Sequence, residues 1–344
     1  MNKDISNKFD KRKGITFEPN NILYGKLRPY LKNWLLPDFK GVALGDFWGF
    51  EASNSSPIFD YFLIQTEKYQ EVANLSAGTK MPRSDWKVVS ETNFLIPLDI
   101  SEQTAIGSFF RTLDTTITLY KRKLNGLHEL KKAYLQQMFP QAGERMPKVR
   151  FAGFEGDLEE RELGEIADIV GGGTPSTDND KYWNGNIDWY APAEIGEQIF
   201  LEGSRRKITE LGFQESSAKM LPVGTVFFTS RAGIGNTAIL TKKGTTNQGF
   251  QSIVPHKNEL DSYFIFSRTH ELKKYGETVG AGSTFVEVSG KQMARMPILM
   301  PRLSEQISIG SFSRNLDEQI AAQAQKAEQL KQVKSAYLSK MFIL

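Results

Sequence analysis

Polar side chains suited to contact a nucleic acid lie in several glycine-containing loops of this sequence. Arginine, asparagine and glutamine can each form two hydrogen bonds with the edge of a base, and lysine neutralises a phosphate. Glycine lets a backbone approach a ligand closely. The candidate contact residues are Lys26, Arg28, Lys80, Arg83, Thr174, Ser176, Lys181, Ser230, Arg231, Lys242, Asn247 and Gln248. The alternative for each is an ordinary solvated loop, and the nearby Trp183 and Trp189 fit either a core or a contact.

Catalytic patterns are missing from the sequence. The chain has no cysteine and three histidines, which form no HExxH pair, so we expect neither thiolate catalysis nor a metal site. It has no P-loop, and Gly171-Gly172-Gly173 and Gly233-Ile234-Gly235 lack the full GxGxxG register. It also lacks the Asp/Asn-Pro-Pro-aromatic sequence with which amino-methyltransferases hold the target amine. We therefore predict no active site in this chain.

The candidate loops belong to a chain that repeats itself. Residues 101–139 and 304–342 align at an offset of 203 with 19 identities in 39 positions. Upstream, Ala77-Gly78-Thr79 faces Ala281-Gly282-Ser283 at an offset of 204. Solenoid repeats are far shorter than this period. The repeat therefore predicts two copies of one domain, each followed by a similar tail.

Each tail is predicted to form a long helix. Its apolar residues alternate at spacings of four and three, which is a heptad seam. A helix from Ile106 to Met138 would be roughly 50 Å long. The seam residues predicted to pair the two helices are Ile106, Leu113, Ile117, Leu124, Leu127, Ile309, Leu316, Ile320 and Leu330. A helix with one apolar stripe needs a partner, and the other tail is our preferred one. The alternative is that each tail packs on its own domain.

The domains themselves read as mixed α/β globules. The second has short strand patterns, a turn signal at Asn184-Gly185 and one helix from Asp261 to Tyr275 that ends at Gly276. The first repeats the later part of this order, with a strand at 22–24, a helix at 57–69 and the segment 94–97. The predicted fold class is therefore mixed α/β, with two globules separated by two long antiparallel coiled-coil helices.

The two copies differ in length. Residue 1 aligns near residue 205, so the first copy has no counterpart of residues 163 to about 204. We expect the first domain to be truncated at its N-terminus. The predicted organisation is a first domain at 1–100, a central helix at 101–140, a linker at 141–162, a second domain at 163–303 and a C-terminal helix at 304–344.

Composition limits the class of protein. The chain has 344 residues, of which 40% are hydrophobic and 24% charged, so it can form about two ordinary cores and is not a disordered protein. No run of 18 apolar residues and no secretory signal is visible, and cysteine is absent, so we expect a cytoplasmic protein. A net charge of +3 permits nucleic-acid binding without requiring it.

The predicted architecture favours DNA as the ligand. One turn of B-DNA measures about 34 Å, so a helical spacer of roughly 50 Å would place two reading domains on separate grooves. Two related but divergent domains would read two different half-sites. Two similar tails could bind two copies of one partner by pseudo-twofold symmetry.

The whole chain resembles the specificity subunit of type I restriction-modification systems. The resemblance rests on the duplicated tails, on the segments GGGTPST and YWNGNIDWY near residues 171–190, and on FFTSRAGIGN at 227–236. It implies two target-recognition domains that each read one part of a split DNA site, and two helical regions that pair antiparallel.

The resemblance also implies partners and cofactors. Two modification subunits would dock on the helices and methylate adenine at N6 with S-adenosylmethionine, and restriction subunits would add ATP- and Mg-dependent translocation and cleavage. The chain itself would carry no catalysis and no cofactor. A full member would have a complete first domain, so the alternatives are a truncated or rearranged allele, one that pairs with another partial subunit, or a helical scaffold that does not contact DNA.

Overall fold

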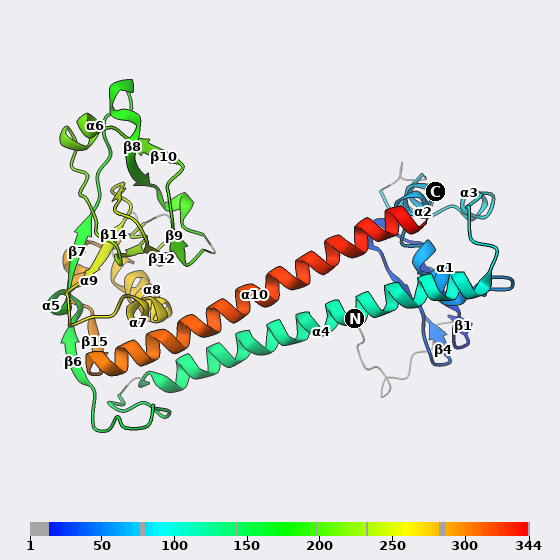
Figure 1. Cartoon of the computed structure of the whole chain (residues 1–344), viewed down its shortest axis with the longest axis horizontal. Coiled ribbons are helices and arrows are strands. Elements are labelled where there is room, and N and C mark those ends of the chain that lie inside the picture. The colour runs from blue at the N-terminus through cyan, green and yellow to red at the C-terminus, as the bar shows by residue number, and fades with distance from the viewer. Residues whose placement is uncertain are drawn as a thin grey trace. The chain divides into compact units, whose positions relative to one another are not determined.

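The computed structural model describes residues 14–75, 80–141, 143–196, 198–231, 233–281 and 287–342. The chain divides into two compact units, which we call unit 1 (residues 1–125 and 322–344) and unit 2 (residues 126–321). Both units contain helices and strands, which confirms the predicted mixed α/β class. The two long helices α4 (Ile100–Met138) and α10 (Leu303–Met341) each contribute residues to both units (Figure 1).

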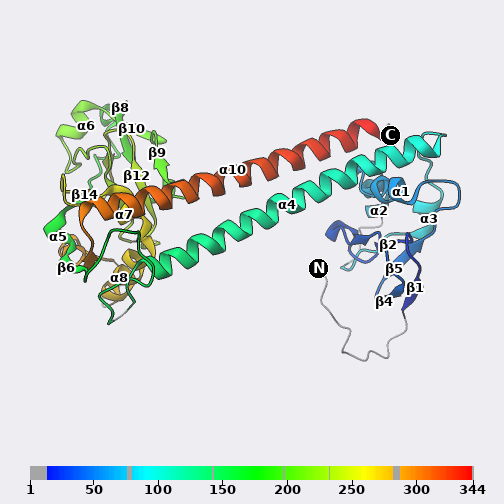
Figure 2. The same ribbon diagram turned by 60° about the horizontal axis from the view of Figure 1, so that its bottom comes forward.

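The described residues of unit 1 form a small globule of short strands and short helices (Figure 2). One antiparallel sheet has the strand order β3-β2-β5, and β1 pairs with β4. Its elements are β1 (Ile15–Phe17), β2 (Ile22–Gly25), the 3-10 turn η1 (Pro29–Leu31), β3 (Trp34–Leu35), β4 (Gly41–Ala43), β5 (Phe47–Phe50), α1 (Pro57–Leu63), α2 (Glu67–Asn74) and α3 (Trp86–Ser90).

Unit 2 is built on a five-stranded mixed sheet with the order β7-β14-β11-β12-β9. A second sheet has the order β10-β8-β13, and β15 pairs with β6. Its strands are β6 (Glu159–Glu162), β7 (Ala167–Gly171), β8 (Trp183–Tyr190), β9 (Phe200–Leu201), β10 (Arg206–Ile208), β11 (Val226–Phe228), β12 (Thr237–Leu240), β13 (Thr245–Thr246), β14 (Gln251–Pro255) and β15 (Pro297–Met300). Its shorter helices are α5 (Leu163–Ile166), η2 (Asp180–Tyr182), η3 (Pro192–Glu194), α6 (Glu210–Gln214), α7 (Ser262–Ser267), α8 (Thr269–Gly280) and α9 (Gly290–Ala294).

The central strand β11 carries apolar side chains on both faces. Val226 and Phe228 join the core that includes residues of α7, α8 and α9, whereas Phe227 points into a second core with Tyr190 and Phe250. Successive side chains of a strand face opposite ways, so a continuous apolar run is what a sheet covered on both faces requires.

The internal repeat is visible in the structure of each unit. The order β3-β2-β5 in unit 1 matches β12-β11-β14 in unit 2, and α1, α2 and α3 match α7, α8 and α9. The bond from the Ser84 N–H to the Lys26 carbonyl matches the bond from Val288 to Ser230, at the offset of 204. This places Lys26 at the position of Ser230, and Arg28 one residue beyond the position of Arg231. The predicted matching loops at 77–79 and 282–283 lie outside the described residues.

Within unit 1, the start of α4 packs against the end of α10. Lys334 bonds to Asp114 at 2.7 Å and also donates to Gln65, and the rings of Phe109 and Tyr337 meet edge to face at 5.3 Å. The apolar cluster here includes residues of α1, α4 and α10 and the buried Phe342, whose ring contacts those of Phe59 and Phe110. In both views the two helices run side by side here (Figures 1 and 2).

Within unit 2, the same contacts recur with the roles of the helices exchanged. Lys131 of α4 bonds to Asp317 of α10 at 2.5 Å, and Asp317 also accepts a bond from the Tyr263 hydroxyl. Tyr134 and Phe312 meet edge to face at 5.0 Å. At the offset of 203, the lysine, the aspartate and the two ring residues are the counterparts of Lys334, Asp114, Tyr337 and Phe109 in unit 1. The seam residues are all shielded: Ile106, Ile117, Ile309 and Leu316 are buried, and Leu113, Leu124, Leu127, Ile320 and Leu330 are half-buried.

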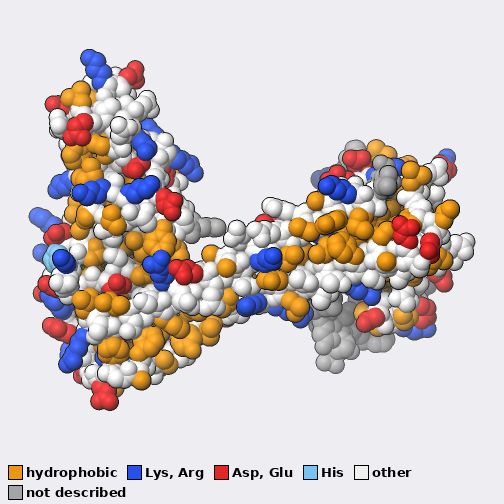
Figure 3. All heavy atoms as spheres, viewed as in Figure 1, with side chains coloured by type: hydrophobic (Ala, Val, Ile, Leu, Met, Phe, Trp, Pro, Cys, Tyr) orange, Lys and Arg blue, Asp and Glu red, His pale blue; other side chains and the backbone are white. Residues whose placement is uncertain are grey.

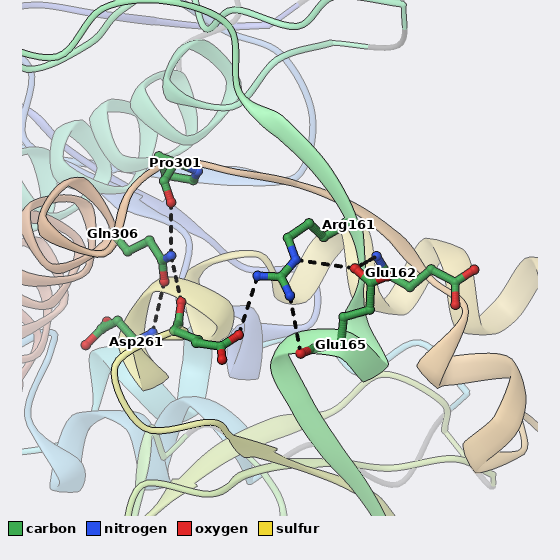
Figure 4. A network of polar contacts seen from close by, with 7 residues as sticks. Arg161, Glu162, Glu165, Asp261, Pro301 and Gln306 are labelled. Carbon is green, nitrogen blue, oxygen red and sulfur yellow. Dashed lines mark hydrogen bonds and ion pairs between the residues drawn. The ribbon is translucent and has the colours of Figure 1, made fainter.

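A buried glutamine ties each long helix to its own globule. The Gln306 side chain accepts from the N–H of Asp261, the N-cap of α7, and donates to the Pro301 carbonyl, both at 3.0 Å (Figure 4). Gln103 does the same in unit 1 with Ser56 and the Pro97 carbonyl. The two alternatives that the sequence left open for the tails are therefore both met in part, because each tail packs on a globule and on part of the other tail.

Close helix contacts also require glycine at two matching positions. A Cβ added at Gly107 would lie 2.8 Å from backbone atoms of Ile58 and Phe59 in α1. A Cβ added at Gly310 would lie 2.5 Å from Asp261 Oδ1. A side chain at either place would push the long helix away from its globule.

Three local predictions from the sequence were wrong. The helices expected at 57–69 and 261–275 are each two helices, α1 with α2 and α7 with α8. Gly276 does not end a helix, because it lies inside α8 where a Cβ would meet the Phe228 ring at 2.9 Å. Asn184-Gly185 lies inside β8, where the pairing with β10 shifts register and Asn184 has a φ of 61°.

No helix in the described part of the chain is both long enough and apolar enough to span a bilayer.

Replacing Gly107 with alanine should destabilise the chain by about 1–3 kcal/mol, because the added methyl group meets backbone atoms that cannot yield locally. The matched control is Gly126→Ala in the same helix, where nothing lies within 4 Å of the new Cβ. That change should stabilise by about 0.5–1 kcal/mol through helix propensity. Urea unfolding measures both, and equal effects of the two substitutions would contradict the close packing at Gly107.

Candidate nucleic-acid interface

One edge of the five-stranded sheet in unit 2 gathers six of the eight candidate residues of that unit. The strands β7 and β11 end at this edge and β12 and β14 begin there, because all neighbouring pairs among them are antiparallel. Three loops follow from this geometry: 172–176 after β7, 229–236 between β11 and β12, and 247–250 before β14. These loops carry Thr174, Ser176, Ser230, Arg231, Asn247 and Gln248.

The loop between β11 and β12 is held by the threonine that precedes it. The Thr229 hydroxyl donates to the Gly233 carbonyl at 2.7 Å and accepts from the Asn236 N–H at 2.9 Å. Gly233 and Gly235 have φ values of 105° and 93°, which favour glycine. The turn therefore depends on the glycines and on Thr229, and it fixes Arg231, which is half-exposed, at the edge of the sheet.

Hydrogen bonds link the three loops to one another. Gly173 N–H donates to the Thr246 carbonyl at 2.8 Å, and the Thr174 hydroxyl donates to Gln248 Oε1 at 2.5 Å. Ser230 N–H donates to the Gly249 carbonyl at 2.9 Å. A Cβ at Gly172 would overlap the backbone oxygens of residues 246 and 247, so glycine is needed for this approach. The edge is thus a single connected surface.

Two tryptophans clamp the loop that carries Thr174. The indole N–H of Trp189 donates to the Gly173 carbonyl at 2.9 Å, and that of Trp183 donates to the Ser176 carbonyl at 3.0 Å. Both rings are buried and meet edge to face at 5.1 Å. The sequence left open whether these tryptophans are core residues or contact residues. In the structure they are core residues that position a loop.

Lys242 and Lys181 lie away from this edge, and of the two serines in its loops Ser176 is exposed and Ser230 faces inward. Lys242 is exposed beyond the C-terminal end of β12, at the opposite edge of the sheet. Lys181 lies before β8, at the far end of that strand from Tyr190. Ser176 is exposed beside Trp183. Ser230 is fully buried, so its backbone belongs to the edge but its hydroxyl is not on the surface.

In unit 1 the four candidates are brought together by a backbone bridge. Leu27 and Arg83 form an isolated antiparallel bridge, and the Arg28 N–H donates to the Pro82 carbonyl at 2.7 Å. Arg28 has a φ of 51°, a conformation that costs a non-glycine residue about 1–3 kcal/mol and is concentrated at functional sites. Lys80 is exposed, and Arg83 bonds to Asp46 at 3.1 Å.

The structure adds residues that the sequence did not single out. Lys273 of α8 lies against the glycine loop, since a Cβ at Gly235 would be 2.9 Å from its Cα. The Arg206 guanidinium lies 3.8 Å from the ring centroid of Trp183. Both contacts join elements distant in sequence, and no pattern in a single sequence reveals them.

A buried carboxylate stabilises the sheet that carries the tryptophans. Burial of Asp188 would raise its pKa, but bonds from the N–H and hydroxyl of Ser204 and from Lys207 prevail, so its pKa lies below the usual value. The carboxylate is therefore charged at neutral pH and holds the turn between β9 and β10 against β8.

Figure 3 shows lysine and arginine side chains over the visible face of unit 2, interleaved with acidic ones. Among the described residues, no group of three histidine, aspartate or glutamate side chains could hold a metal ion. The edge loops offer hydrogen-bonding amide, hydroxyl and guanidinium groups, which suits contact with a polar polymer such as DNA.

Comparison with known proteins gives a consistent result. The family model of the type I restriction modification DNA specificity domain matches residues 155–332, which is just over half of the chain. The chain is 32% identical over 190 residues to the type I restriction enzyme MjaIX specificity subunit of Methanocaldococcus jannaschii, covering 54% of this chain and 44% of that protein. It is 30% identical over 160 residues to the EcoR124I/EcoR124II specificity subunit of Escherichia coli, covering 44% and 39%. The matched region thus spans less than half of these curated relatives.

Solved structures share the fold. The S subunit of a type I restriction-modification system from M. genitalium matches with a TM-score of 0.64 and 16% identity, covering 96% of this chain and 84% of that one. The HsdS subunit from Thermoanaerobacter tengcongensis matches with a TM-score of 0.53 and 21% identity, covering 98% and 84%.

Removing either indole N–H should loosen the loop that carries Thr174. We expect Trp189→Phe and Trp183→Phe to destabilise unit 2 by about 1–3 kcal/mol each, because a backbone carbonyl loses its donor. Amide hydrogen exchange at Thr174, Ser176 and Thr177 should accelerate. Trp86→Phe, at a 55% exposed position in unit 1, is the control, and unchanged exchange in both clamp variants would refute the clamp.

The Asp188 contacts should make stability depend on pH. A carboxylate with a lowered folded pKa stabilises fully above its unfolded pKa of about 3.9, and this contribution disappears as pH falls through the folded value. We expect Asp188→Asn to cost about 1–3 kcal/mol at pH 7 and to flatten the acid limb of the unfolding curve. Tryptophan fluorescence in urea at pH 3–7 measures this, with the exposed Asp178→Asn as the control. An acid limb unchanged by Asp188→Asn would rule out this role.

Proposed function

The chain belongs to the type I restriction-modification DNA specificity family, and we propose that it directs such a system to a two-part DNA site. Its family identifies it as a DNA-recognition component rather than a catalytic subunit. Unit 1 and unit 2 would each read one part of the site. The single observation that carries this proposal is the repeat of the same strands, helices and backbone bonds in both units.

In unit 2, the connected edge of the sheet is the proposed reading surface. Arg231, Asn247 and Gln248 supply the groups that pair with base edges, and Lys273 beside the loop supplies a charge for phosphate. Thr229 and the two tryptophans position these groups without touching DNA. Lys242 lies at the other edge of the sheet, so we assign it no role in base reading.

In unit 1, the proposed surface is the bridge between the segments at 26–28 and 80–83. Lys26 stands at the position of Ser230, and Arg28 is held in its left-handed conformation by the Pro82 carbonyl. Lys80 and Arg83 add charge on the second segment. This surface is the counterpart of the edge in unit 2, with different side chains, as expected for a different half-site.

The two long helices are the proposed frame and docking surface for partner subunits. Modification subunits would bind there and methylate adenine with S-adenosylmethionine, and restriction subunits would supply ATP- and Mg-dependent steps. The duplicated helix contacts support this, because two similar surfaces suit two copies of one partner. The complex would act in the cytoplasm, where the DNA is.

Co-expression with its modification subunit in a host without DNA methylation tests the proposal. Single-molecule sequencing of the host genome should find methylated adenines in a motif with two specified parts and an unspecified gap. A motif with one specified part would exclude a reading role for one unit, and the absence of methylation despite an assembled complex would favour a scaffold that does not read DNA.

Arg231→Ala should relax the motif at one or two positions, because a bidentate contact to a base contributes about 1–3 kcal/mol of discrimination. Lys242→Ala is the matched control and should leave the motif unchanged. A uniform drop in methylation at all sites in Arg231→Ala, with an unchanged motif, would instead assign this side chain to phosphate.

A further inference from the structure

Unit 2 contains a pocket of about 780 Å³ that is separate from the edge of the sheet described above. One face of α4 forms a wall, with His128, Lys132, Leu135 and Phe139 at helical spacing. The start of α8, the strand β15 and the segment that follows α4 contribute the other lining residues. In Figure 2 this end of α4 lies beside α8. The volume of the pocket is in the range of small-molecule sites.

The charges that line the pocket are mainly basic. Glu271 is paired with Arg268, and Glu144 lies 4.0 Å from Lys148, so Glu160 is the acidic lining residue without an ion pair among the described residues. Five basic lining residues likewise have no ion pair in the part of the chain that the structure describes: His128, Lys132, Arg145, His270 and Lys274. The uncompensated charge therefore attracts an anion.

A buried arginine adds directed donors to this charge. Arg268 is 4% exposed, and its guanidinium lies near the rings of Phe139 and Phe264, at 5.0 and 5.6 Å from their centroids. It donates from Nε and Nη2 to the Glu271 carboxylate and from Nη1 to the Leu299 carbonyl at 2.6 Å. A guanidinium has five N–H groups. One N–H on each terminal nitrogen thus has no partner among the described residues and is available to a ligand.

The internal repeat separates the basic residues of the pocket from those that hold the two long helices together. Lys131 also lines the pocket, but it pairs with Asp317 and recurs in α10 as Lys334. Its neighbour Lys132 is replaced at the same offset of 203 by Ser335. Residues 57–75, which form α1 and α2, contain neither arginine nor histidine, whereas the matching α7–α8 stretch brings both into the pocket. Unit 1 therefore keeps the helix contacts without these basic groups, so the contacts do not explain them.

We propose that this pocket binds a nucleoside di- or triphosphate. The phosphates would lie among Lys132, Lys274 and the available N–H groups of Arg268, and the nucleoside would lie against Leu135 and Pro297. Several anionic oxygens suit several cations, whereas a single carboxylate would leave most of these cations uncompensated. Inorganic phosphate would leave the apolar part of the lining uncovered. This site goes beyond the reading of DNA by either unit and does not depend on it.

Fluorescence anisotropy of ATP that carries a methylanthraniloyl label tests the proposal, with the full chain and without DNA. Binding should be saturable, and Lys132→Ser should weaken it at least about tenfold because a charged hydrogen bond to phosphate is lost. Lys274→Gln should weaken it similarly. Lys121→Ser is the matched control, because Lys121 is exposed in the same helix and does not line the pocket. This variant should bind the nucleotide like the unchanged chain.

Hydrogen exchange locates the nucleotide, which should slow exchange at residues 269–274. The absence of saturable binding, or equal weakening by Lys132→Ser and Lys121→Ser, would overturn the proposal. Equally tight binding of the labelled nucleoside without phosphates would overturn it as well, because the basic groups would then play no part. Displacement of the nucleotide by a short DNA duplex would instead assign the pocket to the phosphates of DNA.

Discussion

The antiparallel contact between the two long helices is the constraint on which the rest of the structure depends. In each unit, half of one helix meets half of the other through an aspartate–lysine ion pair and an edge-to-face aromatic pair. The ion pair is Asp114 with Lys334 in unit 1 and Asp317 with Lys131 in unit 2. Each helix must also lie close to a globule, which the glycines and the buried glutamines enforce. A helix that satisfies a partner helix and a globule at once has little freedom to shift along its axis.

Much of this frame could be predicted from the sequence. The repeat and the heptad seam indicated two domains and two long helices, and the helices begin and end within a few residues of the predicted positions. The sequence showed that Gln103 and Gly107 recur in the second tail, but it did not show their roles. Those roles depend on contacts with residues distant in sequence, such as Ser56 and Ile58. The breaks between α1 and α2 and between α7 and α8 were missed because apolar periodicity continues through them.

The reading surface was harder to predict. Loop composition found Arg231, Asn247 and Gln248, which share one edge, but it also selected Lys242 at the opposite edge and Ser230 in the interior. The reason is that residue type indicates what a side chain could contact, whereas strand direction decides where each loop lies. Trp183 and Trp189 show the same limit, since their N–H groups act on carbonyls seven and sixteen residues away.

The repeated helix contacts have an evolutionary consequence. One tail alone contains both members of each pair: Asp114 and Lys131 in the first, Asp317 and Lys334 in the second. A single ancestral copy would therefore be self-complementary, and two such molecules could join around a twofold axis with every pair formed twice. Gene duplication and fusion would then preserve the assembly in one polypeptide, while leaving each globule free to diverge toward its own target.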